Sequence, residues 1–252
     1  MKLIPLFGIR LFLVITLYGS THSYCQLTDT LAFPVQHKGN QFLRKFAIPT
    51  VMIGLGIYGT TDNNIINHDE IREERFEYFP GFTNKADNYL QFAAIPAVFV
   101  MDAFHIKATH VIKEQLWLLG KSQLIMFSLV YPLKQWTHVL RPDSSANNSF
   151  PSGHTAQAFL AATFFYKEYG KKYPVLGIGM FTVATGIGIL RILNNKHWIS
   201  DVLAGAGIGI LSVELASLLP SLKQLNKHKI SASLVPSYRS GHFNMTALVN
   251  LP

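Results

Sequence analysis

Charged residues and cysteines are scarce in this chain of 252 residues. Asp, Glu, Lys and Arg make up 14% of the sequence, whereas a typical soluble protein has about 25%. The single cysteine, Cys25, excludes an internal disulfide and a cysteine-based metal site. The net charge is +8, but no basic patch with interleaved aromatic residues is present, so nucleic acid is not an expected partner. The composition therefore favours a membrane protein.

Long apolar stretches account for the low share of charge. They lie at residues 46–59, 89–106, 116–133, 156–166, 173–193 and 202–219. A transmembrane helix needs about 20 residues, which the last two stretches provide. The second and third stretches are also expected to span the membrane. The first stretch is short. The fourth reaches membrane length if its helix runs from Ser152 to residue 169. The sequence thus predicts an all-α fold, a membrane-embedded bundle of about five to six helices, with paired glycines that allow close helix packing.

Four regions are expected along the chain. Residues 1–25 have two basic residues before an apolar run, as a signal peptide does, and an uncleaved signal anchor is the alternative. Residues 26–88 would form an N-terminal extension with a short apolar helix and an acidic, aromatic connecting loop. Residues 89–220 would form the catalytic helical bundle. Residues 221–252 would form a tail, in which alternating apolar residues, interrupted at 239–241, indicate a short β-hairpin.

Two of three short polar segments between the apolar stretches supply cations and a turn. Lys134 and Arg141 are seven residues apart, so on a helix they would point the same way, two turns apart. Pro142 would end that helix. In the next segment, Pro-Ser-Gly-His at 151–154, Ser152 is the expected N-cap of the following helix. The backbone N–H groups of the next two residues would then lie at the positive end of a helix dipole, where anions bind.

The third polar segment contains Arg191, His197 and Asp201. We expect His197 to open a helix and Asp201 to follow one turn later, so that the carboxylate can orient the imidazole. Three cations and a helix N-terminus suit a phosphate, and two histidines with a carboxylate suit cleavage of its ester bond. For that chemistry His197 must be neutral to attack, and His154 must carry a proton for the leaving oxygen.

Together the three segments resemble the signature of the type 2 phosphatidic acid phosphatase superfamily, Lys-x6-Arg-Pro, Pro-Ser-Gly-His and Ser-Arg-x5-His-x3-Asp. The resemblance covers about residues 90–220, and Leu190 departs from it where the pattern often has Ser. It implies a metal-independent phosphatase without a cofactor, in which His197 forms a phosphohistidine, His154 is the acid and Asp201 supports His197. The phosphate would be held by Lys134, Arg141, Ser152, Gly153 and Arg191.

The lysine distribution predicts which side of the membrane holds these segments. Lysine clusters at 107–113, 167–172 and 223–229 lie at the helix ends opposite the polar segments, and such clusters face the cytoplasm. The site would therefore face the periplasm from a bacterial inner membrane. Its partners would be the bilayer and a phosphorylated lipid or polyprenyl pyrophosphate. If residues 46–59 span the membrane, the lysines before them are cytoplasmic only when the N-terminal segment is retained. If that segment is cleaved, residues 46–59 are expected to be re-entrant or interfacial.

Other classes of protein also use parts of this pattern. A periplasmic nonspecific acid phosphatase or a vanadate-dependent haloperoxidase would use the same pocket, but the apolar stretches weigh against both. A non-catalytic membrane protein with a vestigial site is a further alternative, disfavoured because every required residue is present. The last alternative is a metal site with His138, His154, His197 and Asp201 as ligands. The neighbouring cations weigh against it, because they would repel a metal ion.

Overall fold

The computed structural model describes residues 38–61, 68–227, 231–239 and 242–250. The chain divides into two units, residues 1–38 and 39–252, and the elements below belong to the second apart from Lys38. The expected signal segment at 1–25 lies outside the described residues, and the expected region boundaries stay predictions. In chain order the elements are α2 (Lys38–Tyr58), α3 (His68–Tyr78), α4 (Asp87–Leu90), α5 (Ala94–Ala103), α6 (Ile112–Thr137), α7 (Gly153–Phe165), the π-helix η1 (Tyr166–Gly170), α8 (Pro174–Leu193), α9 (Ile199–Leu218), α10 (Leu222–Lys227), β1 (Ser231–Arg239) and β2 (His242–Asn250).

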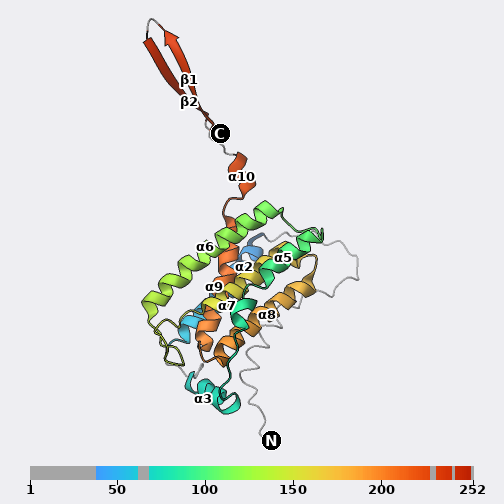
Figure 1. Cartoon of the computed structure of the whole chain (residues 1–252), viewed down its shortest axis with the longest axis vertical. Coiled ribbons are helices and arrows are strands. Elements are labelled where there is room, and N and C mark those ends of the chain that lie inside the picture. The colour runs from blue at the N-terminus through green and yellow to red at the C-terminus, as the bar shows by residue number, and fades with distance from the viewer. Residues whose placement is uncertain (1–37, 62–67, 228–230, 240–241, 251–252) are drawn as a thin grey trace. The chain divides into compact units, whose positions relative to one another are not determined.

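Helix α7 is the centre of the bundle. It packs against α5, α6, α8 and α9, and every residue from 155 to 165 is buried. Figure 1 shows the neighbouring helices around it. Because α7 is covered on all sides, its apolar residues are not confined to one face; Leu160 and Phe164, for example, are both fully buried. The predicted all-α bundle is confirmed.

Glycines on α9 bring that helix close to α7. A Cβ added at Gly205 would lie 2.5 Å from the carbonyl oxygen of Ser152, and one added at Gly209 would overlap the carbonyl oxygen of Ala156. Such small residues let two helix backbones approach within a membrane. The expected close packing is therefore confirmed on α9, whereas Gly186 on α8 faces open space.

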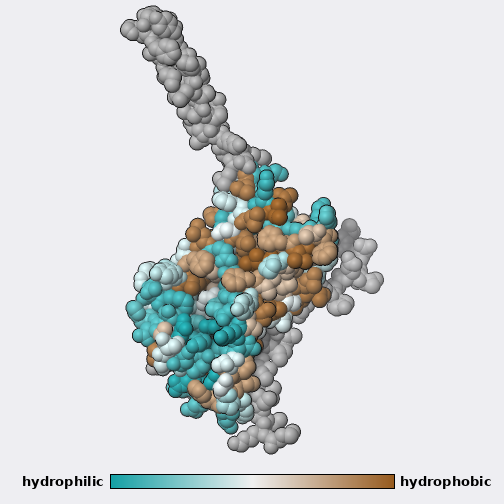
Figure 2. Space-filling model, in the orientation of Figure 1, coloured by the Kyte–Doolittle hydropathy of each residue, from teal (hydrophilic) through white to brown (hydrophobic). Residues whose placement is uncertain are grey.

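Within the described residues, three helical segments are long and apolar enough to cross a membrane: Ile112–Thr137, Pro174–Leu193 and Ile199–Gln224. The outer faces of α6 and α8 expose large apolar side chains, including Leu124, Phe127, Tyr131, Val175 and Ile178. In Figure 2 apolar residues cover one part of the bundle, and hydrophilic residues cover the end where α3 lies. Exposed apolar patches of this extent suit contact with lipid. The chain is a membrane protein.

Two expected elements differ in the structure. Residues 89–106 do not form one spanning helix, because turn residues 91–93 separate α4 from α5. Pro96 has no N–H for the carbonyl of residue 92, so the helical hydrogen bonds are interrupted there. The acidic region after residue 67 was expected to be a loop but contains α3. Asp69 and Glu70 lie in its first turn, where negative charge favours a helix.

Three further expectations concern the first stretch, the fourth stretch and the tail. Residues 46–58 of the first stretch lie within α2, whose apolar part, Lys45–Tyr58, is shorter than the three candidate spans. Helix α7 alone has 13 residues and continues into η1 as far as Gly170, as expected, but this segment is not among the three candidate spans. The predicted hairpin is confirmed, since β1 and β2 pair antiparallel from Ser231 with Asn250 to Arg239 with His242.

Candidate active site

Lys134 lies in the last turn of α6 and reaches over the start of α7. Its Nζ donates a hydrogen bond to the carbonyl of Asn148 at 2.7 Å. A Cβ added at Gly153 would be 3.9 Å from Cε of Lys134, so the lysine side chain and the glycine turn are neighbours. The structure thus brings the first and second polar segments together.

Arg141 lies in a loop and not on the helix that carries Lys134. Helix α6 ends at Thr137, and His138 has a left-handed backbone with φ of 48°. The N–H of Arg141 bonds to the carbonyl of Ala146, and Val139 accepts from a later residue of the same loop. The expectation of one helical face for both cations is wrong, because these loop hydrogen bonds replace helical ones before Pro142 is reached.

The second polar segment begins α7 as predicted. Ser152 is the N-cap, and its side chain accepts a hydrogen bond from the N–H of Thr155 at 3.4 Å. Its own N–H donates to the carbonyl of Asp201 at 3.0 Å, which ties this turn to α9. The first N–H groups of α7, those of Gly153 and His154, are left without helical acceptors by the geometry of a helix start. They therefore offer donors to an anion.

His197 and Asp201 form a buried pair. The Nδ1 atom of His197 is 3.2 Å from Oδ2 of Asp201, and both side chains are almost wholly buried. Helix α9 begins at Ile199, so His197 precedes this helix and does not open it, and Trp198 is the N-cap. The predicted His–Asp contact is nevertheless present, because Asp201 turns back toward the residues before the helix.

The surroundings of His197 keep its imidazole neutral. The pKa of His197 is lowered to about 4, chiefly by burial; Asp201 opposes this shift, and the positive charges of Lys134 and Arg191 add to it. Its Nδ1 faces the Asp201 carboxylate, which favours the tautomer with a proton on Nδ1. The lone pair is then on Nε2, as nucleophilic attack requires.

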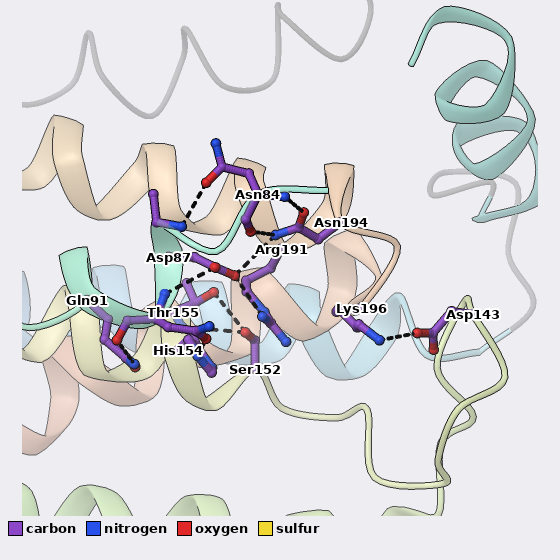
Figure 3. Close-up of polar contacts among 12 residues, drawn as sticks. Asn84, Asp87, Gln91, Asp143, Ser152, His154, Thr155, Arg191, Asn194 and Lys196 are labelled. Carbon is purple, nitrogen blue, oxygen red and sulfur yellow. Dashed lines mark hydrogen bonds and ion pairs between the residues drawn. The ribbon is translucent and has the colours of Figure 1, made fainter. Parts of the chain in front are cut away.

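Arg141 and Arg191 retain unused hydrogen-bond donors. Arg191 is buried and donates from Nη1 to Oδ2 of Asp87 at 2.7 Å, as Figure 3 shows. The Nε atoms of Arg141 and Arg191 are buried and have no partner within the described part of the chain. A buried unpaired guanidinium N–H costs free energy unless it meets an acceptor. An anion with several oxygens, such as phosphate, would supply those acceptors.

His154 lies at the polar end of α7, outside the three candidate spans. Its Nε2 is 2.8 Å from Oδ1 of Asn88. Burial lowers the pKa of His154 to about 4, and the positive charges of Arg191, Lys134 and Arg141 contribute. All three predicted phosphate cations therefore act on this imidazole. A bound phosphate dianion would offset their charge and favour a proton on His154.

Three residues with contacts in the site were not predicted from the sequence. The hydroxyl of Ser149 donates a short hydrogen bond to Oδ2 of Asp201. Asp87 contacts Arg191, and Asn88 contacts His154. Ser149 lies just before the second polar segment in the sequence, and this closeness was the only signal that could have pointed to it. Asp87 and Asn88 precede Arg191 by about a hundred residues, and no spacing rule connects them.

The metal-site alternative finds no support in the geometry. Within residues 38–61, 68–227 and the two strands, no group of three His, Cys, Asp or Glu side chains could hold a metal ion. His138, the additional histidine of that alternative, lies in the loop after α6.

Comparison with known proteins finds a family match over the three polar segments. Residues 115–224, which include Lys134 to Asp201, match the family model of the PAP2 superfamily. The resemblance carried by the three polar segments is thus confirmed. Asp87 and Asn88 lie outside the matched residues.

Curated relatives of this chain are bacterial. A lipid A 1-phosphatase of Porphyromonas gingivalis is 38% identical over 185 residues, which cover 71% of this chain and 39% of the relative. A phosphatidylglycerophosphatase B of Bacillus subtilis is 31% identical over 93 residues, which cover 31% of this chain and 45% of the relative. The matched region spans less than half the length of either relative.

A solved structure shares the fold. A transmembrane PAP2-type phosphatidylglycerolphosphate phosphatase from Bacillus subtilis superimposes with a TM-score of 0.52 at 21% identity, covering 69% of this chain and 94% of that one. Aquifex aeolicus LpxE gives a TM-score of 0.48 at 23% identity, covering 63% of this chain and 98% of that one. At this identity the first likeness concerns the arrangement of helices alone.

Proposed function

We propose that this protein is a metal-independent phosphatase that removes phosphate from a lipid phosphate or lipid pyrophosphate through a phosphohistidine intermediate. The observation that carries the proposal is the buried His197–Asp201 pair among three cations, two of which have unpaired buried Nε atoms. The exposed apolar faces of α6 and α8 favour a substrate held in the same bilayer. They weigh against the soluble acid phosphatase and haloperoxidase alternatives.

In the first step Nε2 of His197 attacks the terminal phosphorus, and the bond from that phosphorus to the bridging oxygen breaks. His154 gives its proton to that oxygen, so a monoester leaves as the lipid alcohol and a pyrophosphate leaves as the lipid monophosphate. Asp201 accepts a hydrogen bond from Nδ1 and stabilises the positive charge that develops on the ring of His197. In the second step water attacks the phosphohistidine, His154 takes the proton of the water, and inorganic phosphate leaves.

Lys134, Arg141 and Arg191 would bind the nonbridging oxygens. Guanidinium groups make charge-assisted and often bidentate contacts with phosphate. The N–H groups of Gly153 and His154 would add donors from the start of α7. These contacts strengthen as negative charge accumulates in the transition state, which is where stabilisation raises the rate.

The substrate is proposed to be a phosphate monoester or pyrophosphate of a bacterial envelope lipid, on the periplasmic side. The lipid A 1-phosphatase relative makes the 1-phosphate of lipid A the first substrate to test. The phosphatidylglycerophosphatase relative adds a second. The site lies at one end of the apolar helices, where a membrane-anchored lipid could present its headgroup without leaving the bilayer.

The test is a phosphate-release assay with the full chain in detergent micelles. Lipid A, phosphatidylglycerophosphate and a polyprenyl pyrophosphate would be compared with p-nitrophenyl phosphate, with and without EDTA and vanadate. We expect lipid substrates to be preferred, vanadate to compete and EDTA to have no effect. His197→Ala should abolish turnover and any acid-trapped phosphoenzyme. Retention of activity within roughly tenfold of wild type, about 1.4 kcal/mol in barrier, would contradict the nucleophile assignment.

A further inference from the structure

The segment before α5 contacts two of the proposed active-site residues. Asp87 is buried, and its Oδ2 accepts hydrogen bonds from Arg191 at 2.7 Å and from Asn194 at 3.3 Å. The next residue, Asn88, places its Oδ1 2.8 Å from Nε2 of His154. Two consecutive residues therefore hold one phosphate cation and the proposed acid.

A second set of contacts fixes this segment to the turn after α8. Asn194 donates from Nδ2 to the carbonyl of Asn84 at 2.7 Å, and the N–H of Asn84 donates to Oδ1 of Asn194 at 2.8 Å. Figure 3 shows Asp87 between this Asn–Asn pair and Arg191. The segment is therefore anchored beside Arg191 by contacts that do not depend on Arg191 itself.

We propose that Asp87 and Asn88 are positioning residues of the active site, Asp87 for the guanidinium of Arg191 and Asn88 for the imidazole of His154. This inference rests on the proposed phosphatase function. With Nη1 held by Asp87, the remaining N–H groups of Arg191 are directed to the phosphate. With Nε2–H donated to Asn88, the proton that His154 transfers is the one on Nδ1.

Asn88 suits this task because its oxygen accepts from His154 before and after proton transfer. The imidazolium donates from Nε2 to Asn88 and from Nδ1 to the leaving oxygen. After transfer the ring is neutral and still carries its Nε2 proton. The tautomer is thereby fixed by a group that does not itself ionise, as a partner on the second ring nitrogen does in other histidine sites.

Variants of Asn88 separate positioning from a purely structural role. Asn88→Leu should lower kcat on a lipid phosphate by roughly tenfold to hundredfold. A correctly placed general acid raises the rate by roughly 10²–10⁴-fold, and a misplaced one loses part of this. With p-nitrophenyl phosphate the loss should be much smaller, because nitrophenolate leaves without a proton. Lys85→Gln, in the same exposed segment, is the matched control and should behave as wild type.

The pH profile provides the second readout. The charged groups that act on His154 are Arg191, Lys134 and Arg141, which lower its pKa, and Asp87, which raises it. Asn88→Asp adds a carboxylate at Nε2 and should stabilise the imidazolium. The alkaline limb of kcat should therefore move to higher pH in Asn88→Asp and to lower pH in Asn88→Leu.

Asp87 should act on binding and not on the leaving group. Asp87→Asn keeps the size of the side chain but removes the charge that holds Arg191, so KM and the inhibition constant of vanadate should rise together.

Equal losses on both substrates for Asn88→Leu, with an unmoved pH limb, would overturn the positioning role. If the wild type released no phosphate, the proposed function would be wrong, and the positioning role would need a test without turnover. The tautomer of ¹⁵N-labelled His154 is that test, since the proton on Nε2 should be lost in Asn88→Leu.

A different observation supports a second inference, at the opposite end of the bundle. A cleft of about 620 Å³ lies where α6 begins and α7 and α9 end, and five lysines line it: Lys45, Lys121, Lys167, Lys171 and Lys223. Only two carboxylates line the cleft, Glu114 and Glu214. Glu214 pairs with Lys167 at 2.9 Å, and Glu114 accepts from two backbone N–H groups of α10.

The cleft combines unpaired charge with apolar walls. Lys45, Lys171 and Lys223 form no ion pair within the described residues. Trp117 and Tyr166 line the same cleft and are partly exposed. Basic clefts between transmembrane helices bind anionic headgroups, and aromatic residues favour the membrane interface. We propose that this cleft binds the phosphate of an anionic phospholipid, independently of the active site.

Phosphatidylglycerol is a suitable probe because it is a phosphodiester and not a phosphomonoester substrate. The unfolding temperature of the full chain in detergent should rise with phosphatidylglycerol and not with phosphatidylcholine, since a ligand stabilises the state that it binds. Lys171→Gln with Lys223→Gln should remove the rise, whereas Lys107→Gln with Lys113→Gln should keep it. An equal rise in both double variants, or one produced by the soluble diester glycerophosphoglycerol alone, would overturn the lipid site.

Discussion

At the scale of single residues, one oxygen of Asp201 organises much of the site. Its Oδ2 accepts hydrogen bonds from the N–H of Trp198 at 2.9 Å and from the hydroxyl of Ser149, and it faces Nδ1 of His197. Several donors on one oxygen fix the position of the carboxylate. It can therefore hold the imidazole in one tautomer and balance the charge of a phosphohistidine.

Replacing this carboxylate tests its role. Asp201→Asn should leave the fold intact and lower kcat by roughly 10²–10⁴, because the amide no longer balances the imidazolium charge and can favour the wrong tautomer. Phosphate release by the detergent-solubilised variant measures the loss. Asp69→Asn, on the exposed face of α3, is the matched control. Equal activity of the two variants would show that Asp201 does not support His197.

The buried state of His197 predicts the acid limb of the pH profile. The attacking ring must be unprotonated, and burial lowers the pKa of His197 to about 4. As pH falls, kcat/KM for p-nitrophenyl phosphate, corrected for ionisation of the substrate, should stay level to about pH 4 and then decline. An unperturbed histidine would give a limb near pH 6.5. A measured limb at that higher value would mean that His197 is solvated or is not the nucleophile.

At the scale of elements, the contact between α7 and α9 aligns the polar segments. Both helices start at the site, and the N–H of Ser152 bonds to the carbonyl of Asp201. Gly205 packs against the carbonyl of Ser152. The separation of the proposed acid from the proposed nucleophile therefore depends on how closely these two helices approach.

A single methyl group tests that dependence. Gly205→Ala should separate the two helix starts and destabilise the protein by about 1–3 kcal/mol, the usual cost of overpacking. Both the unfolding temperature and kcat should fall. Gly186→Ala on α8, where a Cβ meets nothing within 4 Å, should lower neither, since alanine favours a helix more than glycine does. Similar losses in the two variants would show that the effect does not come from the α7–α9 contact.

At the scale of the whole molecule, two groups of cations lie at opposite ends of the bundle. The proposed phosphate-binding cations lie near the starts of α7 and α9, and the lysine cleft lies near their ends. Positively charged loops remain on the cytoplasmic side of bacterial membranes. This distribution supports the proposal that the active site faces the periplasm.

Impermeant thiol reagents test the orientation in a Cys25→Ser background. Asn147→Cys, in the exposed loop before α7, should be labelled in intact spheroplasts, whereas Lys171→Cys at the opposite end should be labelled only after lysis. Labelling of Lys171→Cys alone in intact spheroplasts would reverse the orientation. Every periplasmic lipid would then be removed from the proposed substrates.

The sequence by itself determined the class of fold and named most residues of the candidate site. Apolar stretches of membrane length predict helices because lipid offers no partner for unpaired backbone groups. The three polar segments were recognisable because each holds its residues within a few positions, and short spacing limits geometry. Ser152 as N-cap and the contact between His197 and Asp201 are local features of this kind, and the structure contains both.

Only the tertiary structure decided the long-range partners. Asp87 and Asn88 reach Arg191 and His154 across many intervening residues, and no local pattern records such a contact. The early end of α6 was likewise decided by hydrogen bonds within a loop, which compete with the helix. Helical periodicity describes neighbours along the chain, whereas the packing of α4, α7 and α8 selects which polar groups meet.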